Sequence, residues 1–123
     1  MSYYVTNTNT EIRIPAEKIP AMMDAVNKEF CTSFTDVRKM LGHFGYSDYD
    51  AEPDGSLTYF SREYDKWNAD SEGFLYTIGP YVDEGSYLDF VGEDGSAWRF
   101  YFNGKCAAEY NGHMVYTGCP KED

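Results

Sequence analysis

The sequence predicts an α+β domain in which an antiparallel sheet, completed by a C-terminal β-meander, carries two or three short helices packed on one face. Three observations lead to this prediction. Apolar side chains recur at helical spacing in the first two thirds of the chain, and short alternating segments separated by glycine turns follow from residue 86 onward. The length of 123 residues is that of one ordinary domain. We therefore expect residues 1–123 to form a single acidic α+β domain.

The composition describes a folded and strongly acidic chain. An apolar fraction of 42% and an aromatic fraction of 18% are too high for a disordered chain. Ten Lys and Arg residues stand against twenty-one Asp and Glu residues, which gives a formal net charge of -11. This charge repels phosphate backbones and anionic lipids. We therefore expect no direct contact with nucleic acid or a membrane, and we expect a partner protein with a basic groove.

The location of the protein is predicted from the absence of targeting signals. The chain has no run of about 18 apolar residues, and its first residues, MSYYVTNTNTEIRIP, lack the basic-then-apolar order of a signal peptide. Three cysteines, Cys31, Cys106 and Cys119, have no regular spacing, which favours reduced thiols over a disulfide framework. We therefore expect a cytoplasmic protein.

The first elements are predicted from alternation and from proline positions. Residues 11–14, with the sequence EIRI, alternate in polarity and predict a short strand that Pro15 ends. Residues 21–30 carry apolar side chains at helical spacing, and Pro20 suits the first position of that helix.

Two further helices are predicted from capping residues. Ser33 or Thr35 is expected to cap a second helix that Gly42 ends. Residues 68–78 begin with capping residues and end before a Gly-Pro pair, which predicts a third helix. Between these helices, a Pro-Asp-Gly turn predicts a hairpin with strands at residues 46–51 and 56–61.

The last part of the chain is predicted to form a four-stranded meander. Its turn signals are Gly-Glu-Asp-Gly at residues 92–95, Asn-Gly at residues 103–104 and Asn-Gly at residues 111–112. A three-residue first loop predicts three cross-strand pairs, namely Phe90 with Trp98, Leu88 with Phe100 and Asp89 with Arg99. Two-residue loops at the other turns place Ala107 beside Phe100, Cys106 opposite Tyr101 and Val115 beside Ala108.

This register divides the side chains of the meander between two faces. The core face is predicted to hold Leu88, Phe90, Trp98, Phe100 and Phe102. The opposite face is predicted to hold Tyr87, Asp89, Arg99, Tyr101 and Tyr110. Such a face is either covered by a third layer, for which the N-terminal segment or a second copy is a candidate, or it is a contact surface.

The hairpin around residue 54 carries a run of acidic and aromatic side chains, namely Asp48, Tyr49, Asp50, Glu52 and Asp54. A calcium loop that began at Asp50 would have Gly55 at its sixth position, but Ser61 would occupy its twelfth position, where a glutamate is needed. A solvated acidic hairpin is therefore favoured over a metal site.

The sequence offers no catalytic or cofactor motif. Cys106, His113 and Cys119 are zinc-ligand types, but they lack a short Cys-x-x-Cys spacing and a fourth ligand. Neither His43 nor His113 lies beside a recognisable nucleophile motif. We therefore expect no enzyme activity and no cofactor.

Residues 79–105, GPYVDEGSYLDFVGEDGSAWRFYFNGK, together with residues 14–17, IPAE, resemble a group of small acidic proteins of bacteria and their phages. That group combines Ala-Pro-Tyr/Phe-Val, Gly-Ser-Tyr-Ile, Gly-Glu-Asp-Gly and Trp-Arg in a similar order. The resemblance covers residues 11–117 and is specific only in the C-terminal third, and Gly79 stands where the group has Ala. It implies a phage-associated protein in the host cytoplasm and supplies no catalytic residues.

The predicted function is that of a protein-binding inhibitor that occupies the nucleic-acid-binding surface of a host defence protein such as a CRISPR or restriction effector, with carboxylates that mimic the charge of DNA. Two alternatives remain open at this point. One is a small-molecule or metal-binding module, and the other is a structural domain whose acidity serves only solubility. The predicted contact residues are Asp48, Tyr49, Asp50, Glu52, Asp54, Tyr87, Asp89, Arg99, Tyr101 and Tyr110.

Overall fold

A computed structural model describes residues 3–63, 65–110 and 114–116 of the chain and confirms the α+β class. Within these residues the elements are β1 (Tyr4–Glu11), η1 (Ala16–Lys18), α1 (Ile19–Phe30), α2 (Val37–His43), β2 (Asp48–Ala51), β3 (Leu57–Ser61), β4 (Asp65–Lys66), α3 (Ala69–Ile78), η2 (Gly79–Tyr81), β5 (Tyr87–Gly92), β6 (Ala97–Phe102), β7 (Ala107–Tyr110) and β8 (Met114–Tyr116). The η elements are single 3₁₀ turns.

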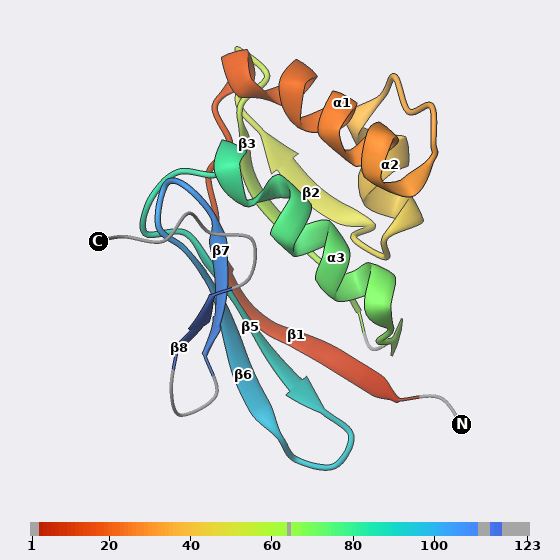
Figure 1. Cartoon of the computed structure of the whole chain (residues 1–123), viewed down its shortest axis with the longest axis vertical. Helices are drawn as coiled ribbons and strands as arrows, with labels where there is room; N and C mark the ends of the chain where they lie inside the picture. Colours follow the sequence, from red (N-terminus) through yellow and green to blue (C-terminus); the bar gives the residue numbers. More distant parts are fainter. Residues whose placement is uncertain (1–2, 64, 111–113, 117–123) are drawn as a thin grey trace.

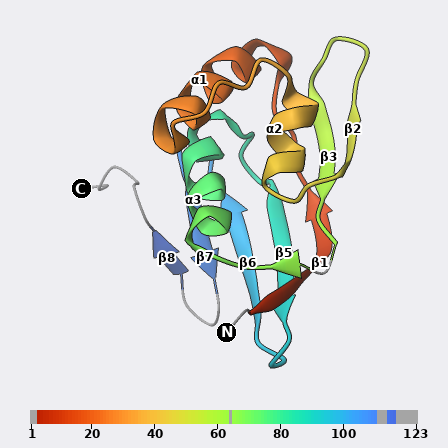
Figure 2. The same ribbon diagram turned by 90° about the vertical axis from the view of Figure 1, so that its right-hand side faces the viewer.

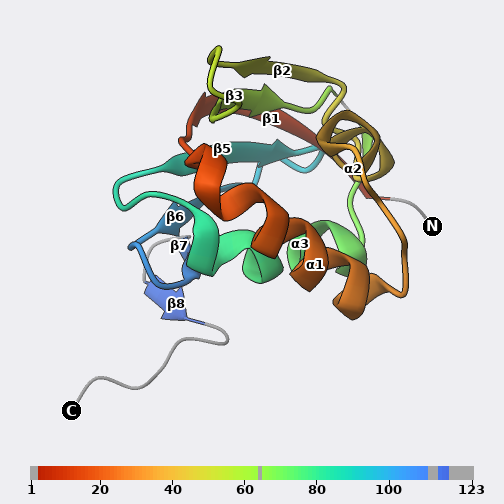
Figure 3. The same cartoon turned by 90° about the horizontal axis from the view of Figure 1, so that it is seen from above.

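One curved sheet organises the fold. Six strands in the order β4-β1-β5-β6-β7-β8 pair antiparallel throughout, and β2 pairs with β3 in a separate two-stranded sheet. Figure 1 shows the helices on one side of the large sheet, and Figure 2 shows α1, α2 and α3 in front of its strands. Seen from above in Figure 3, β2 and β3 lie beyond β1 and continue the curve of the sheet. The predicted arrangement of helices on one face is thus confirmed.

The N-terminal strand differs from the prediction. The strand is β1, which ends at Glu11, whereas the sequence predicted a strand at residues 11–14. Ile14 instead makes an isolated bridge to Leu57. The prediction failed because β1 is rich in Asn and Thr, and its backbone gains its partners from β4 and β5 rather than from a local hairpin. Because β1 is a strand of the sheet, it does not supply a third layer over the outer face.

The helix ends follow local capping chemistry. Helix α1 begins at Ile19, so Pro20 lies in its first turn at the second position rather than at the predicted first position. The cap of α2 is Asp36, whose Oδ1 accepts a hydrogen bond from the backbone N–H of Arg38 at 2.7 Å, so the prediction of Ser33 or Thr35 was wrong. Helix α3 begins after Asn68, as predicted.

The predicted register of β5 and β6 is confirmed, whereas the next two registers are shifted. Asp89 lies opposite Arg99 and Phe90 lies opposite Trp98. Ala107 lies opposite Phe102 rather than Phe100, a shift of two residues.

Asn103 explains this first shift. Its Oδ1 accepts hydrogen bonds from the N–H groups of Lys105 and Cys106, both at 2.9 Å, and its own N–H donates to the Cys106 carbonyl at 3.2 Å. The loop therefore spans residues 103–106 and includes Cys106, and the residue opposite Tyr101 is Ala108. In the last pair Val115 lies opposite Glu109 rather than Ala108.

The core face of the meander is largely as predicted. Leu88, Phe90, Phe100 and Phe102 have no exposed surface. Trp98 is only half-buried; it lies near the start of β6, next to the β5–β6 loop. There its ring meets that of Trp67 edge-on at 5.7 Å between centroids.

One cysteine, Cys106, departs from the predicted reduced state. Cys106 is disulfide-bonded, whereas Cys31 is free and exposed.

In the part of the chain that the structure describes, no helix has both the length and the apolar character that crossing a bilayer requires.

Candidate functional site

Strands β5, β6 and β7 bring together five of the predicted contact residues on the sheet face away from the helices. We call this group the outer-face cluster; it comprises Tyr87, Asp89, Arg99, Tyr101 and Tyr110. The strand register pairs Tyr87 with Tyr101 and Arg99 with both Asp89 and Tyr110, and paired residues share a face. No described element covers this face, and Tyr110 is 45% exposed.

Arg99 contacts two other members of the outer-face cluster, Asp89 and Tyr87. Its Nε donates to Oδ1 of Asp89 at 2.6 Å, and its Nη2 donates to Oδ2 at 3.0 Å. The guanidinium carbon also lies 4.0 Å from the centroid of the Tyr87 ring, which is a cation–π distance. The hydrogen bond that Arg99 donates to Asp89 is the largest cause of a raised pKa of Arg99. The side chain is therefore held in one orientation before any partner arrives.

A shallow hollow of about 420 Å³ adjoins the outer-face cluster. Asp89, Arg99 and Tyr110 line it together with Thr8 of β1 and Val91 of β5. The hollow combines apolar walls with one ion pair, a mixture that suits the edge of a protein contact.

The acidic hairpin comprises Asp48, Tyr49, Asp50, Glu52 and Asp54. Two of its carboxylates are exposed to solvent, and the other two make contacts within the fold. Asp48 and Asp50 are exposed on β2, and Tyr49 between them packs against the core. The strand period of two places both carboxylates on the outward side of β2.

The other two carboxylates of the acidic hairpin serve the fold. Glu52 forms an ion pair with Arg13, and Oδ1 of Asp54 accepts a hydrogen bond from the backbone N–H of Ser56 at 2.8 Å. The hydrogen bonds from Ser56, first from its backbone and then from its side chain, lower the pKa of Asp54. Only Asp48 and Asp50 of this group are therefore left exposed without a hydrogen bond or ion pair to a described side chain.

The acidic hairpin and the outer-face cluster do not form one continuous site. The acidic hairpin belongs to the two-stranded sheet, and β1 lies between that sheet and β5. Among residues 3–63, 65–110 and 114–116, no group of three or more His, Cys, Asp or Glu side chains could hold a metal ion. Two members of the zinc-ligand set that the sequence disfavours, His113 and Cys119, lie outside the described residues.

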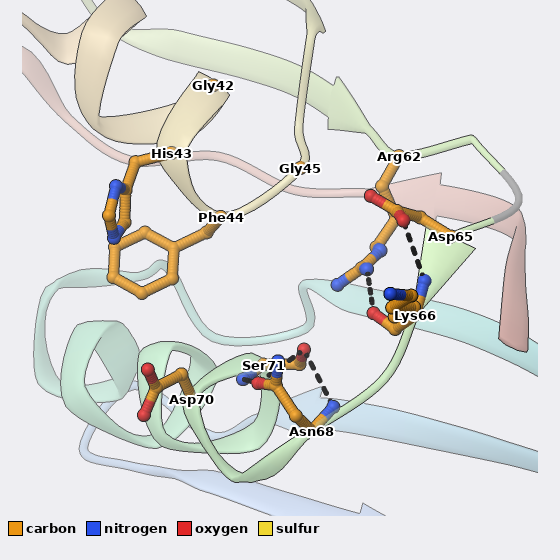
Figure 4. Close-up of a pocket in the computed structure, with 10 residues that line it drawn as sticks. All are labelled: Gly42, His43, Phe44, Gly45, Arg62, Asp65, Lys66, Asn68, Asp70 and Ser71. Atoms are coloured by element: carbon orange, nitrogen blue, oxygen red, sulfur yellow. Dashed lines mark hydrogen bonds between the residues drawn. The ribbon is translucent and has the colours of Figure 1, made fainter. Parts of the chain in front are cut away.

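A third site was missed by the sequence analysis. Figure 4 shows a cavity, which we call the Arg62 cavity, between the end of α2, the start of α3 and the segment that follows β3. Its volume is about 360 Å³, and its lining residues include His43, Arg62, Lys66 and Asn68. The only signal in the sequence is the period of β3, which places Arg62 two residues after the buried Phe60 and thus on the inward side.

Comparison of the chain with models of known protein families, with the curated proteins and with the solved structures gives no match. The resemblance to small acidic proteins of bacteria and phages therefore stays a prediction.

Proposed function

We propose that this protein acts by binding another protein through a basic surface of that partner, without a catalytic step. The observation that carries the proposal is the Asp89–Arg99–Tyr87 arrangement on the sheet face that no described element covers. Tyrosine and arginine are enriched among the residues that dominate binding energies. Because the fork and the ring already fix Arg99, little side-chain entropy is lost when a partner binds.

Charge selects the kind of partner. The net charge of -11 steers the chain toward a cationic surface and disfavours anionic ones. Asp48 and Asp50 project from β2 and are available to Lys and Arg side chains of such a surface. The partner that we propose is a nucleic-acid-binding protein of a host defence system, such as a CRISPR or restriction effector, because its groove is built to accept negative charge.

The test is affinity capture from a bacterial lysate at about 50 mM and about 300 mM salt, an interval over which screening weakens exposed charge contacts. We would compare the wild-type chain with an outer-face variant, Arg99→Ala with Tyr110→Ala, and with a hairpin variant, Asp48→Asn with Asp50→Asn. The matched control is Asp24→Asn with Glu29→Gln, which removes two exposed charges from α1.

The expected result is one basic protein that the wild-type chain and the α1 control retain at low salt. The outer-face variant should lose this protein, the hairpin variant should bind it more weakly, and duplex DNA should displace it. Equal capture by all four chains would refute the proposed surface. If no specific protein is captured and the wild-type chain instead shows a thermal shift with a metal ion or nucleotide, the small-molecule alternative replaces this proposal.

A further inference from the structure

Arg62 is a buried cation. It directly follows Ser61, the last residue of β3, and is only 4% exposed. Its backbone N–H donates to Oδ1 of Asn7 in β1 at 3.3 Å, which fixes the point from which the side chain enters the protein. A guanidinium keeps its charge throughout the ordinary pH range, so the fold contains a permanent positive charge here.

The guanidinium has few partners. Its Nη2 donates to the backbone carbonyl of Lys66 at 2.7 Å. Its Nε and Nη1 are buried and lack a hydrogen-bond partner among the residues that the structure describes. No carboxylate among the described residues lies within 4.0 Å of its nitrogens, although the chain has twenty-one Asp and Glu residues. Most of the N–H bonds of the group are therefore unused.

Two aromatic rings compensate this charge only in part. The guanidinium carbon lies 5.2 Å from the centroid of the Trp67 ring and 5.7 Å from that of the Tyr46 ring. Such contacts contribute about 0.5–2 kcal/mol each, whereas an ion removed from water without a counterion costs several kcal/mol. The stabilisation from the two rings is smaller than the cost of burying the charge, whereas a counterion could offset that cost.

The Tyr46 hydroxyl adds a second unpartnered polar group beside the first. It is buried without a well-aligned hydrogen-bond partner among the described residues, and burial raises the pKa of Tyr46. The charge of Arg62 and a side-chain contact with it oppose this rise, so the two groups interact. Unpaired polar atoms at one place in a core are uncommon and require an explanation, such as a bound water or a bound ion.

The Arg62 cavity lies beside the Arg62 side chain, which forms part of its lining. Figure 4 shows the guanidinium pointing from the end of β3 into the space beside Phe44 and above Asn68. His43 and Lys66 contribute two more basic side chains to the lining. Asn68 is the N-cap of α3, a helix of ten residues, and a helix N-terminus favours negative charge.

We propose that the Arg62 cavity binds a small oxyanion, either a carboxylate or a phosphate group, that serves as the counterion of Arg62. Asp65 and Asp70 also line the cavity and limit the negative charge that it accepts, so the ligand is a small anion rather than a polyanion. Because Nε and Nη1 each expose less than 1 Å², the wall of the cavity shifts slightly as the anion enters. The site shares no lining residue with the outer-face cluster and does not depend on the proposed function.

The test uses thermal unfolding of the whole chain in acetate, in inorganic phosphate and in chloride at matched ionic strength and pH. We expect acetate, phosphate or both to raise the melting temperature of the wild-type protein saturably and by a few degrees more than chloride does. Arg62→Met should abolish this increment. The matched control Arg38→Met removes an exposed arginine at the start of α2 and should keep it.

The response of the melting temperature to each anion identifies the kind of ligand. A response to acetate alone assigns a carboxylate ligand, a response to phosphate alone assigns a phosphate ligand, and a response to both assigns a general oxyanion site. Phosphate also stabilises proteins by exclusion from their surface, and that effect would remain in Arg62→Met. The proposal is overturned if the two anions act no more strongly than chloride on the wild-type protein, or if Arg62→Met responds as the wild type does.

A second measurement covers the case in which Arg62→Met does not fold. Titration of the wild-type protein with the same salts, followed through the arginine Nε–H signals in ¹H–¹⁵N spectra, should move one buried signal saturably. Arg62→Lys keeps the charge but lacks the planar fork, and the moving signal should be absent from its spectrum. A linear drift of all arginine signals together would contradict the proposal.

Discussion

Asp89 and Arg99 form a two-point ion pair across the β5–β6 ladder, with Nε–Oδ1 and Nη2–Oδ2 distances of 2.6 Å and 3.0 Å. The two side chains are 24% and 43% exposed, so solvent screens part of the attraction. We expect a double-mutant cycle of Asp89→Ala and Arg99→Ala, measured by urea unfolding, to give a coupling energy of about 0.5–1 kcal/mol. The coupling should fall at high salt. A coupling within error of zero would show that this pair orients Arg99 without stabilising the fold.

Gly79 is required where η2 passes the β6–β7 loop. A Cβ at this position would lie 2.5 Å from the backbone nitrogen of Ala107 and 2.9 Å from the carbonyl carbon of Cys106. Backbone atoms cannot move aside at low cost, so we expect Gly79→Ala to lower the free energy of unfolding by about 1–3 kcal/mol.

Gly42 is the matched control for this substitution. It lies in α2, and a Cβ there would meet nothing within 4 Å. Gly42→Ala should leave stability unchanged or raise it by up to about 1 kcal/mol, because alanine loses less backbone entropy in a helix. Urea midpoints for the two variants test the difference, and equal midpoints would contradict the close approach at Gly79.

Glu109 should make stability depend on pH. Burial and, to a smaller extent, the charge of Glu72 raise its pKa, and a hydrogen bond from Tyr76 opposes the rise. A carboxyl whose pKa is raised by folding contributes stability below its unfolded pKa and loses it as the pH rises through the folded value. At pH 7 the ionised group is therefore unfavourable. We expect Glu109→Gln to stabilise the protein at pH 7, by less than about 1 kcal/mol because the group is partly exposed.

The control for Glu109→Gln is Glu29→Gln, which changes the net charge equally at an exposed position of α1. The difference between the two variants should be present at pH 7 and disappear below about pH 4, where the carboxyl is protonated in both the folded and the unfolded chain. Chemical unfolding across this range measures it. A difference that grew toward acidic pH would mean that the sign is wrong.

Helix α2 should depend on Asp36 and not on its neighbour Thr35. Because the Asp36 side chain accepts the N–H of Arg38, Asp36→Ala should cost about 1 kcal/mol of stability. Thr35→Ala should cost less than about 0.5 kcal/mol, since an exposed position outside the cap contributes little. Thermal or urea unfolding of the two variants compares the caps directly, and a larger loss for Thr35→Ala would restore the cap expected from the sequence.

The β5–β6 hairpin shows what local pattern is able to predict. Its loop length and its cross-strand pairs indicate the same register, so Asp89 meets Arg99 as expected. The predicted register of the next hairpin was wrong because the Asn103 side chain closes a wider loop. An Asn-Gly pair in the sequence does not show how long the loop around it will be. Likewise the outer-face cluster followed from alternation, whereas the Arg62 cavity did not, because its lining comes from three separate segments.

By itself, the sequence determined the α+β class, the three helices, the β5–β6 register and the two faces of the meander, because periodicity and turn chemistry act between residues that are close in the chain. Only the tertiary structure decided that β1 lies between β4 and β5, that Gly79 contacts the loop before β7, and that Arg62 is a buried cation without a carboxylate partner among the described residues. These features depend on which distant segments pack together. Burial and electrostatic pairing depend on those neighbours and not on the order of residues along the chain.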